Sequence, residues 1–219
     1  MTATANSAGL DGRALRAMRT RAGIVPAHVD LLQDGNLRPR AEEITGRAGV
    51  SVRSLWTHFP DLESLFQATA AEVLDRQDAD FRPVDPTLPI DERIDAYTRQ
   101  RARVLERIGP FARASVLREP ESPSLRDYHR RHVPRVSDEL RVLFAAELAD
   151  LPESDREAQL LALTAVSTWG SWSTLRDDLG LDREAACAVV ARSVMAIVLT
   201  GLDRRPVSST RSSEREGSR

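Results

Sequence analysis

Residues 40–59 read RAEEITGRAGVSVRSLWTHF, and this stretch determines how the N-terminal part of the chain folds. Ile44 and Ala48 are four residues apart, which is the spacing of one helix face. Gly49 can adopt the left-handed conformation that a tight turn requires, and the Ser51 hydroxyl can cap a following helix. The stretch therefore predicts two short helices joined by a sharp turn.

The second of these helices, predicted over residues 52–59, has an apolar inner side and a polar outer side. We expect the two helices to share a core made of Ile44, Val50, Leu55 and Phe59. The outer side then presents Val52, Arg53, Ser54 and Thr57. This is the arrangement of a helix-turn-helix pair, in which the N-terminal residues of the second helix contact base edges in DNA.

The same stretch resembles the DNA-binding domain of the TetR family of bacterial transcriptional regulators, and the resemblance covers residues 24–78. It rests on Ile44, Ala48-Gly49-Val50-Ser51, Trp56-Thr57-His58-Phe59 and Pro60-Asp61-Leu62-Glu63-Ser64-Leu65. It implies an all-α homodimer with a helix-turn-helix domain over residues 24–80 and a helical ligand-binding and dimerisation domain over residues 90–202. It also implies a transcriptional regulator, most often a repressor, that a small-molecule effector releases from a double-stranded DNA operator.

Carried over by position, the family's reading helix falls on Ser51 to His58. Arg53 is the main candidate for a base contact, because its planar guanidinium can bond guanine O6 and N7 together. The resemblance places Trp56 and His58 at the phosphate backbone. The other candidates are Arg40 for a phosphate, Val52 for a thymine methyl, Ser54 and Thr57 for a base or phosphate, and Ser51 at the start of the helix.

Structural alternatives exist for three of these residues. Arg53 could be an ordinary solvated arginine, Trp56 could be partly in the core, and His58 could merely close the helix end. Two further positions depart from the family pattern. Leu62 stands where many members have a phosphate-binding lysine, so that contact falls to backbone amides at the helix start. Pro26 lies early in the predicted first helix, which we therefore expect to be short or to begin there.

The net charge of −2 is unevenly distributed along the chain, whose basic residues are all arginine. Residues 1–60 hold eight arginines and five acidic residues, a net charge of +3, and the remainder holds 23 and 28, a net charge of −5. This split suits a nucleic-acid footprint and equally an ordinary protein surface. Residues 1–23 are expected to form a disordered or basic arm containing Arg13, Arg16, Arg19 and Arg21.

The rest of the chain is predicted to be helical. Aromatic residues make up only 5% of the 219 residues, while alanine, leucine and arginine are abundant, which favours helix over sheet. The proline-rich segment 81–89 marks the expected domain boundary. Beyond it we expect a kink or split at Pro134, helices over residues 90–108, 110–118, 124–148, 154–179 and 182–202, and a disordered tail over residues 203–219.

Two C-terminal segments indicate burial against a second copy. From residue 185 to 202 the single charge is Arg192, and residues 160–166 are also apolar. A membrane span is disfavoured, because a central arginine costs about 2.5–3.5 kcal/mol on insertion scales. A helix that is apolar nearly all round is instead buried on several sides. We expect a homodimer through the helices near 154–179 and 182–202, and no membrane partner.

The resemblance also implies a small-molecule pocket in the second domain. Its candidate lining residues are Phe111, Tyr128, Phe144, Trp169 and Trp172, for which ordinary core or dimer packing is an equal alternative. His129 and His132 are three residues apart, but no third metal ligand is identifiable. Cys187 lies among alanine and valine, as an inert core thiol would. We therefore predict no metal site.

Sequence signatures of catalysis are missing, including G-x-S-x-G, a phosphate-cradling glycine loop and H-E-x-x-H. The chain is expected not to be an enzyme and to need no cofactor. Residues 1–23 contain no apolar run of signal-peptide type, which predicts a cytoplasmic protein. The alternatives are a helical small-molecule-binding protein or enzyme that has lost DNA binding, and a dimeric interaction module without a ligand.

Overall fold

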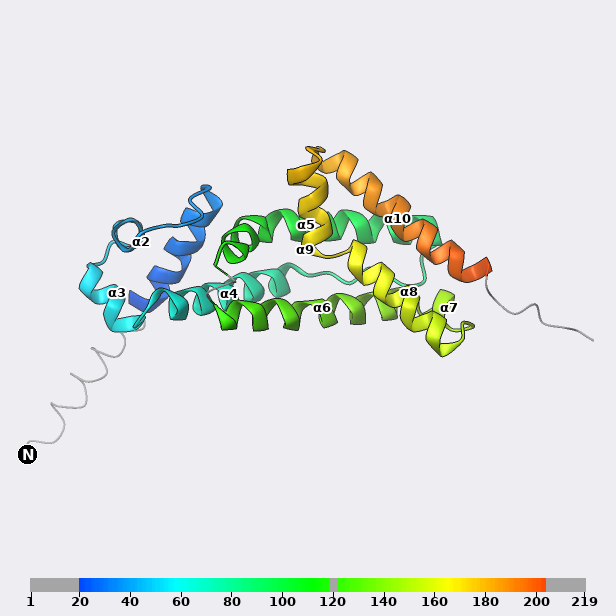
Figure 1. The fold of residues 1–219 in the computed structure, drawn as a ribbon, viewed down its shortest axis with the longest axis horizontal. Helices are drawn as coiled ribbons and strands as arrows, with labels where there is room; N and C mark the ends of the chain where they lie inside the picture. Colours follow the sequence, from blue (N-terminus) through cyan, green and yellow to red (C-terminus); the bar gives the residue numbers. More distant parts are fainter. Residues whose placement is uncertain (1–19, 119–121, 204–219) are drawn as a thin grey trace, which may run out of the picture.

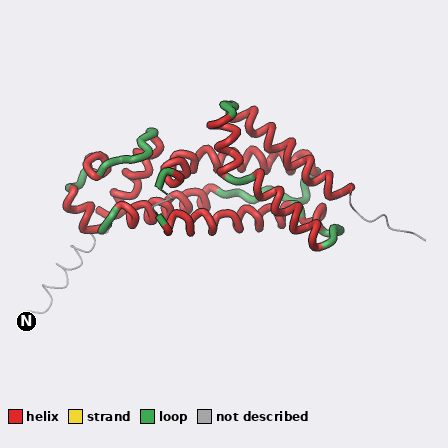
Figure 2. Tube along the Cα trace, viewed as in Figure 1, coloured by secondary structure: helices red, strands yellow, loops and turns green. Residues whose placement is uncertain are grey.

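The computed structural model describes residues 20–118 and 122–203, which fold into helices with no strand among them (Figure 1, Figure 2). The prediction of an all-α fold is confirmed. The first helix covers residues 20–33, so most of the predicted N-terminal arm and C-terminal tail lies outside the described residues. The remaining helices are α2 (Ala41–Ala48), α3 (Val52–His58), α4 (Leu62–Asp80), α5 (Ile90–Val116), α6 (Pro123–Leu143), α7 (Ala145–Leu148), α8 (Glu153–Val166), α9 (Trp169–Ser173), η2 (Thr174–Asp178, a π-helix) and α10 (Arg183–Asp203).

The helices form an elongated molecule with a smaller group at one end (Figure 1). The first helix, α2 and α3 make up that end, and α4 runs from it into a larger body. In the body α5 and α6 run lengthwise, and α8 packs against both α6 and α10. In the two described ranges no helix combines the length and hydropathy needed to cross a bilayer.

Helix α4 connects the helix-turn-helix to the body because it contributes side chains to two buried clusters, one shared with α2 and α3 and one shared with α5. One cluster joins the first helix, α2, α3 and the start of α4 through Ile24, Ile44, Leu55, Phe59 and Leu65. The next joins the first helix and α4 to α5 through Val29, Leu32, Phe66, Val73 and Phe111. Burial of each such side chain contributes about 1.5–3 kcal/mol. A shift of α4 relative to the body must therefore carry the helix-turn-helix with it.

Three prolines lie inside helices, which corrects the boundaries expected from sequence. The first helix extends back to residue 20 and includes Pro26, and α5 and α6 continue through Pro110 and Pro134. In α5 the residue before Pro110 is Gly109, which has no Cβ to clash with the proline ring. In α6 Pro134 is exposed, so water can reach the carbonyl that loses its partner.

Two of the predicted long helices are broken instead at positions without a proline. The helix expected over 124–148 ends at Leu143, because Phe144 leaves helical geometry at φ −109° and ψ 25°. The helix expected over 154–179 is divided into α8, α9 and η2. Thr168 adopts an extended conformation, and its hydroxyl accepts a hydrogen bond from the Ser171 amide at 3.4 Å. This hydroxyl starts a new helix, α9, in a new direction.

Candidate DNA-binding face and ligand cavity

The predicted helix-turn-helix is formed by α2 and α3. Gly49, at φ 66°, ends α2, and the amides of Gly49 and Val50 donate to the carbonyls of Gly46 at 3.4 Å and Thr45 at 3.0 Å. This pair of bonds is a Schellman turn, which satisfies carbonyls at the helix end. The Ser51 hydroxyl then accepts from the Ser54 amide at 3.1 Å and caps α3.

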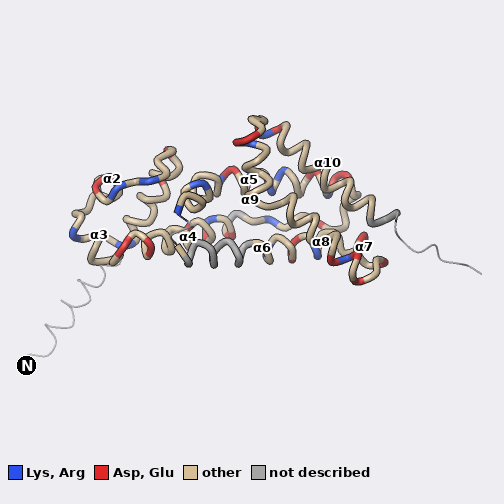
Figure 3. Tube along the Cα trace, viewed as in Figure 1, with Lys and Arg blue, Asp and Glu red and all other residues tan. Residues whose placement is uncertain are grey.

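The inner and outer sides of α3 lie where the sequence predicts them. Ile44 and Leu55 are 0% exposed and Phe59 is 1% exposed, while Val50 packs at the edge of the same cluster. On the outer side, Ser51, Arg53, Trp56 and Thr57 are exposed, and Val52, Ser54 and His58 are half-buried. Figure 3 shows basic residues at the tip formed by α2 and α3, away from the body. The outer side of α3 is therefore accessible to a large partner.

Two arginines flank α3 in different ways. Arg40 is exposed before α2, and its backbone amide donates to the Glu43 carboxylate at 2.7 Å. Arg21 is the described member of the predicted basic arm. Its guanidinium donates to the His58 carbonyl at 3.2 Å and lies 4.7 Å from the centre of the Phe59 ring. Arg21 thus attaches the first helix to the C-terminal end of α3.

The start of α4, where backbone amides are predicted to replace the missing lysine, also carries a capping aspartate. The Asp61 carboxylate accepts a hydrogen bond from the Ser64 amide at 2.7 Å. Hydrogen bonds from the Ser64 amide and hydroxyl hold the pKa of Asp61 below its usual range. A negative charge therefore occupies the helix start, where a DNA phosphate would otherwise meet free amides.

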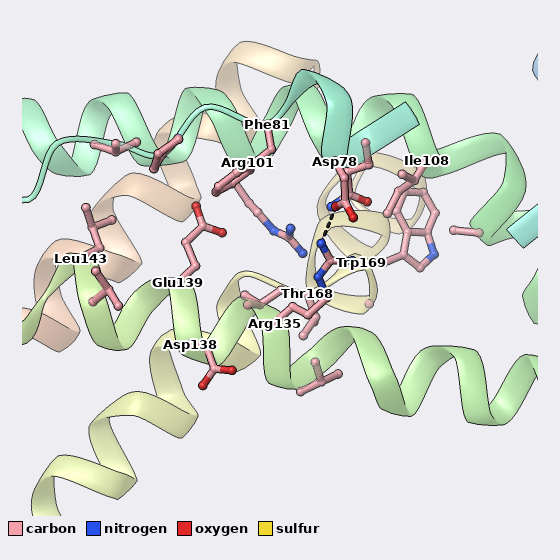
Figure 4. Close-up of a pocket in the computed structure, with 18 of the residues that line it drawn as sticks. Asp78, Phe81, Arg101, Ile108, Arg135, Asp138, Glu139, Leu143, Thr168 and Trp169 are labelled. Atoms are coloured by element: carbon pink, nitrogen blue, oxygen red, sulfur yellow. Dashed lines mark hydrogen bonds and ion pairs between the residues drawn. The ribbon is translucent and has the colours of Figure 1, made fainter. Parts of the chain in front are cut away.

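The body contains a cavity of about 670 Å³ between α4, α5, α6, the segment after α4 and the start of α9 (Figure 4). This volume is in the range of small-molecule sites. Most of its lining is apolar, including Phe81, Ile108, Phe111, Val136, Leu143 and Trp169. Phe111, Val136 and Leu143 are buried, whereas Val116, Val133 and Val142 are exposed, so the cavity has a deep floor and an accessible rim.

The five aromatic candidates for the pocket have different locations. Phe111 and Trp169 line the cavity. Phe144 and Trp172 do not: they are 0% and 2% exposed in the core of the body, where the Trp172 indole donates to Glu106 at 2.9 Å. The sequence spacing of these aromatic residues does not distinguish cavity-lining from core positions, because both kinds of position face the apolar interior of the body. The side chains of Tyr128, His129 and His132 lie outside what the structure describes.

The local sequence does not predict the charged residues of the cavity. Asp78 of α4 forms an ion pair with Arg135 of α6, and Asp138 pairs with Arg141 at 2.8 Å. Figure 4 shows Arg101 of α5 and Glu139 of α6 reaching into the cavity from opposite sides. On α6, Arg135, Glu139 and Val142 recur at helical spacing, but an amphipathic helix surface has the same pattern.

Burial affects Arg101 and Glu139 more than the paired charges. The Arg101 Nε donates to the Ser167 carbonyl at 2.7 Å, which fixes the stem of the side chain. Burial raises the pKa of Glu139, against the opposing effects of the nearby Arg101 charge and of a long hydrogen bond from Gln100 at 3.3 Å. The cavity therefore holds one cation and one carboxylate that are partly desolvated.

A polar network fixes Trp169 in the cavity wall. Arg113 of α5 binds Asp177 of η2 through two hydrogen bonds, of 3.0 and 2.7 Å, and its guanidinium lies 5.2 Å from the centre of the Trp169 ring. Gly109 allows this approach, since a Cβ there would lie 3.2 Å from the same ring. Hydrogen bonding to Arg176 lowers the pKa of Glu106, which links α5 to η2 a second time.

The single cysteine of the chain lies apart from α3 and the cavity. Cys187 is a free, half-buried thiol at the edge of the main core. Among the described residues, no three histidine, cysteine, aspartate or glutamate side chains are grouped as a metal site requires.

A helix-turn-helix with an exposed second helix, at one end of an all-helical body with a large cavity, is the architecture of a helix-turn-helix regulator. Comparison with solved structures narrows this class: the fold is that of the TetR-family transcriptional regulators. A protein from Mesorhizobium loti assigned to that family is 18% identical, covers 84% of this chain and 98% of its own, and has a TM-score of 0.64. A transcriptional regulator from Rhodococcus sp. RHA1 is 17% identical, over 84% and 96%, with a TM-score of 0.61.

Two further comparisons add to this. The multidrug binding protein EbrR, crystallised with imidazole, is 20% identical over 87% of this chain and 97% of its own, with a TM-score of 0.52. In sequence, helix-turn-helix-type transcriptional regulators of Mycobacterium tuberculosis and Mycobacterium bovis are 39% identical over 77 residues, which is 35% of this chain and 40% of each relative. No family model matches the chain. The resemblance to the TetR family is confirmed, and the named relatives are regulators or binding proteins rather than enzymes.

Proposed function

We propose that this protein is a cytoplasmic, homodimeric transcriptional regulator that binds a specific DNA operator and is released from it by a small-molecule effector. The single observation that carries this proposal is the exposed outer side of α3, on which Arg53 and Thr57 are accessible to solvent. An arginine at that position can contact guanine in the major groove. The sequence similarity to helix-turn-helix-type regulators supports the same function.

The mechanism follows from the way α4 joins the two parts. In a dimer each protomer places one α3 in the major groove, with the two helices about 34–36 Å or a multiple of that distance apart. An effector that binds the cavity contacts α4 at Asp78, and α4 carries the helix-turn-helix core. The effector lowers DNA affinity if it prefers a conformation in which this separation is wrong for the operator. We infer repression because most members of the resembled family are repressors.

The proposed dimer interface consists of α8 and α10. These helices act as one unit, because the buried Gln159 of α8 donates to the Ile197 carbonyl of α10 at 2.7 Å. Their free faces expose Leu161 and Leu199, which are 60% and 47% accessible, beside small residues such as Ala158 and Ala196. Exposed apolar side chains next to small ones allow a second pair of helices to pack closely.

Sedimentation velocity tests this interface. Leu161→Glu should convert the dimer to a monomer, because two carboxylates would be buried without partners. Leu117→Glu places the same charge at an exposed leucine outside the interface and should leave the dimer intact. A wild-type protein that sediments as a monomer at micromolar concentration contradicts the proposed dimer.

Genomic fragments captured by the purified full-length protein test DNA binding. Bound fragments should share a palindrome-like sequence, and fluorescence anisotropy should show affinity that falls steeply with salt, because phosphate contacts release counterions. The charge on Asp61 favours one other function, a small-molecule-binding protein that no longer binds DNA. Capture of no preferred sequence would overturn the regulator proposal in favour of that function.

A further inference from the structure

We infer that the cavity is built for an effector with an apolar body and one uncharged head group that both donates and accepts hydrogen bonds, such as a carboxamide. This inference deepens the proposed function. Only the regulatory role of the ligand rests on that function, because binding to the cavity can be measured without DNA. It is carried by the arrangement of charges around the cavity.

The charged side chains of the cavity fall into two groups. Asp78 and Arg135 neutralise each other, and Asp138 is paired with Arg141 outside the lining. Arg101 and Glu139 remain, and no ion pair within the described part of the chain joins either one to a partner. They lie on opposite sides of the same space, and Figure 4 draws no interaction between them. The cavity thus presents a hydrogen-bond donor and an acceptor facing a gap.

The hydrogen-bonding capacity of these two residues is only partly used. The Nε of Arg101 donates to the Ser167 carbonyl, which leaves the two terminal nitrogens as donors. One oxygen of Glu139 accepts from Gln100 at 3.3 Å, and the other has no partner among the described residues. A ligand group placed between them must therefore accept from the guanidinium and donate to the carboxylate.

Arg101 and Glu139 carry opposite charges, and this determines which ligand head groups fit between them. A carboxylate ligand gains an ion pair with Arg101 but faces the Glu139 carboxylate, and an ammonium ligand has the opposite conflict. A like charge brought into a partly desolvated site costs more than a hydrogen bond contributes. An ester can accept from Arg101 but gives Glu139 no donor. An amide supplies a carbonyl oxygen and an N–H group at once, so it satisfies both residues without an added charge.

The remaining lining defines the other half of the ligand. Phe81, Ile108, Phe111, Val136, Leu143 and Trp169 surround the space away from the two charged residues. Burial of an alkyl or aromatic body against these side chains contributes affinity that does not depend on the orientation of the ligand. The head group then determines how the ligand is oriented.

Calorimetry with four ligands of one chain length tests the inference: octanamide, octanoate, octylammonium and methyl octanoate. Octanamide should bind the full-length wild-type protein about 10-fold or more tightly than each of the others, because each of the other head groups leaves Arg101 or Glu139 without a hydrogen-bond partner or beside a like charge. Equal affinities, or a preference for a charged ligand, overturn the inference.

Two variants give a second, directional readout. Glu139→Gln removes the carboxylate but keeps the side-chain shape, so the preference should change to octanoate. Glu92→Gln makes the same chemical change at an exposed carboxylate of α5 outside the cavity lining, and should leave the preference for octanamide unchanged. If Glu139→Gln keeps the wild-type order of ligands while its melting temperature shows it is folded, Glu139 does not contact the head group and the inference fails.

The result separates this inference from the proposed function. Selective octanamide binding by a protein that captures no DNA sequence supports the cavity chemistry and contradicts the regulator. Sequence-specific DNA binding together with no preference among the four ligands supports the regulator and contradicts the cavity chemistry.

Discussion

Asp78, near the C-terminal end of α4, forms an ion pair with Arg135 of α6 in the wall of the cavity (Figure 4). It links the helix that carries the helix-turn-helix to the body at a point that a bound ligand would touch. Both side chains are about half exposed, at 48% and 51%, so solvent screens their attraction. The pair is therefore expected to contribute little to the stability of the fold.

Breaking this pair should change stability little. Asp78→Asn and Arg135→Gln should each lower the free energy of unfolding by about 0.2–1 kcal/mol, because exposed ion pairs contribute in that range. A double-mutant cycle in urea at low salt measures the coupling. If α4 is oriented by this pair, both variants should change operator affinity in the same direction, and the charge swap Asp78→Arg with Arg135→Asp should restore it. If the charge-swapped protein binds the operator no better than the single variants do, the pair does not orient α4.

Arg53→Ala should weaken operator binding by about 1–3 kcal/mol and relax the base preference at one position, because a bidentate arginine–guanine contact is lost. Fluorescence anisotropy with operator variants at that position measures both effects. Arg103→Ala removes the same charge from an exposed site on α5 and serves as the matched control. Equal losses in the two variants would show that Arg53 contributes only general charge.

Gly49 and Gly46 provide a matched test of the turn. Gly49 has φ 66°, and a Cβ there meets nothing within 4 Å, so the cost of Gly49→Ala comes from the left-handed backbone alone. The free energy of unfolding should fall by about 1 kcal/mol. Gly46 is inside α2 with equally open surroundings, and Gly46→Ala should raise stability by up to about 1 kcal/mol. Urea denaturation followed by circular dichroism compares the two, and equal effects contradict the assigned turn geometry.

His28 should make the stability of the protein depend on pH. Its Nδ1 lies 2.7 Å from the Thr69 hydroxyl, which itself donates to the Leu65 carbonyl at 2.8 Å, so Nδ1 must be the donor and Nε2 is unprotonated. Nε2 is buried without a partner in the described chain, and the ring contacts Phe66 edge-on at 4.8 Å. Burial, with a smaller effect from Arg118, lowers the pKa of His28 from 6.5 to about 4.

The direction of the pH effect follows from proton uptake. Between about pH 6.5 and 4 the unfolded chain binds a proton at His28 that the folded chain does not, so stability falls as the pH decreases through this range. The loss should be about 3 kcal/mol at pH 4 relative to pH 7. Thermal unfolding of wild type and His28→Asn over this range isolates the effect, since the variant lacks this titration. Parallel curves would contradict it.

Local sequence was sufficient to predict the helix-turn-helix. The interactions that define it connect residues only three to five positions apart: the Ser51 cap, the Gly49 turn and the spacing of Ile44 and Ala48. The same local rules failed at Pro110 and Pro134. There the helix continues because of a neighbouring glycine in one case and solvent exposure in the other.

The ligand cavity, in contrast, depends on tertiary structure. Asp78, Arg101, Glu139 and Trp169 come from four separate segments, and no spacing within one segment brings them together. Whether an aromatic residue such as Trp169 or Trp172 faces the cavity or the core depends on the break at Ser167–Thr168, which turns α9. Short-range hydrogen bonds and backbone preferences are encoded locally, whereas the shape and charge of an interior space arise only when distant helices pack against one another.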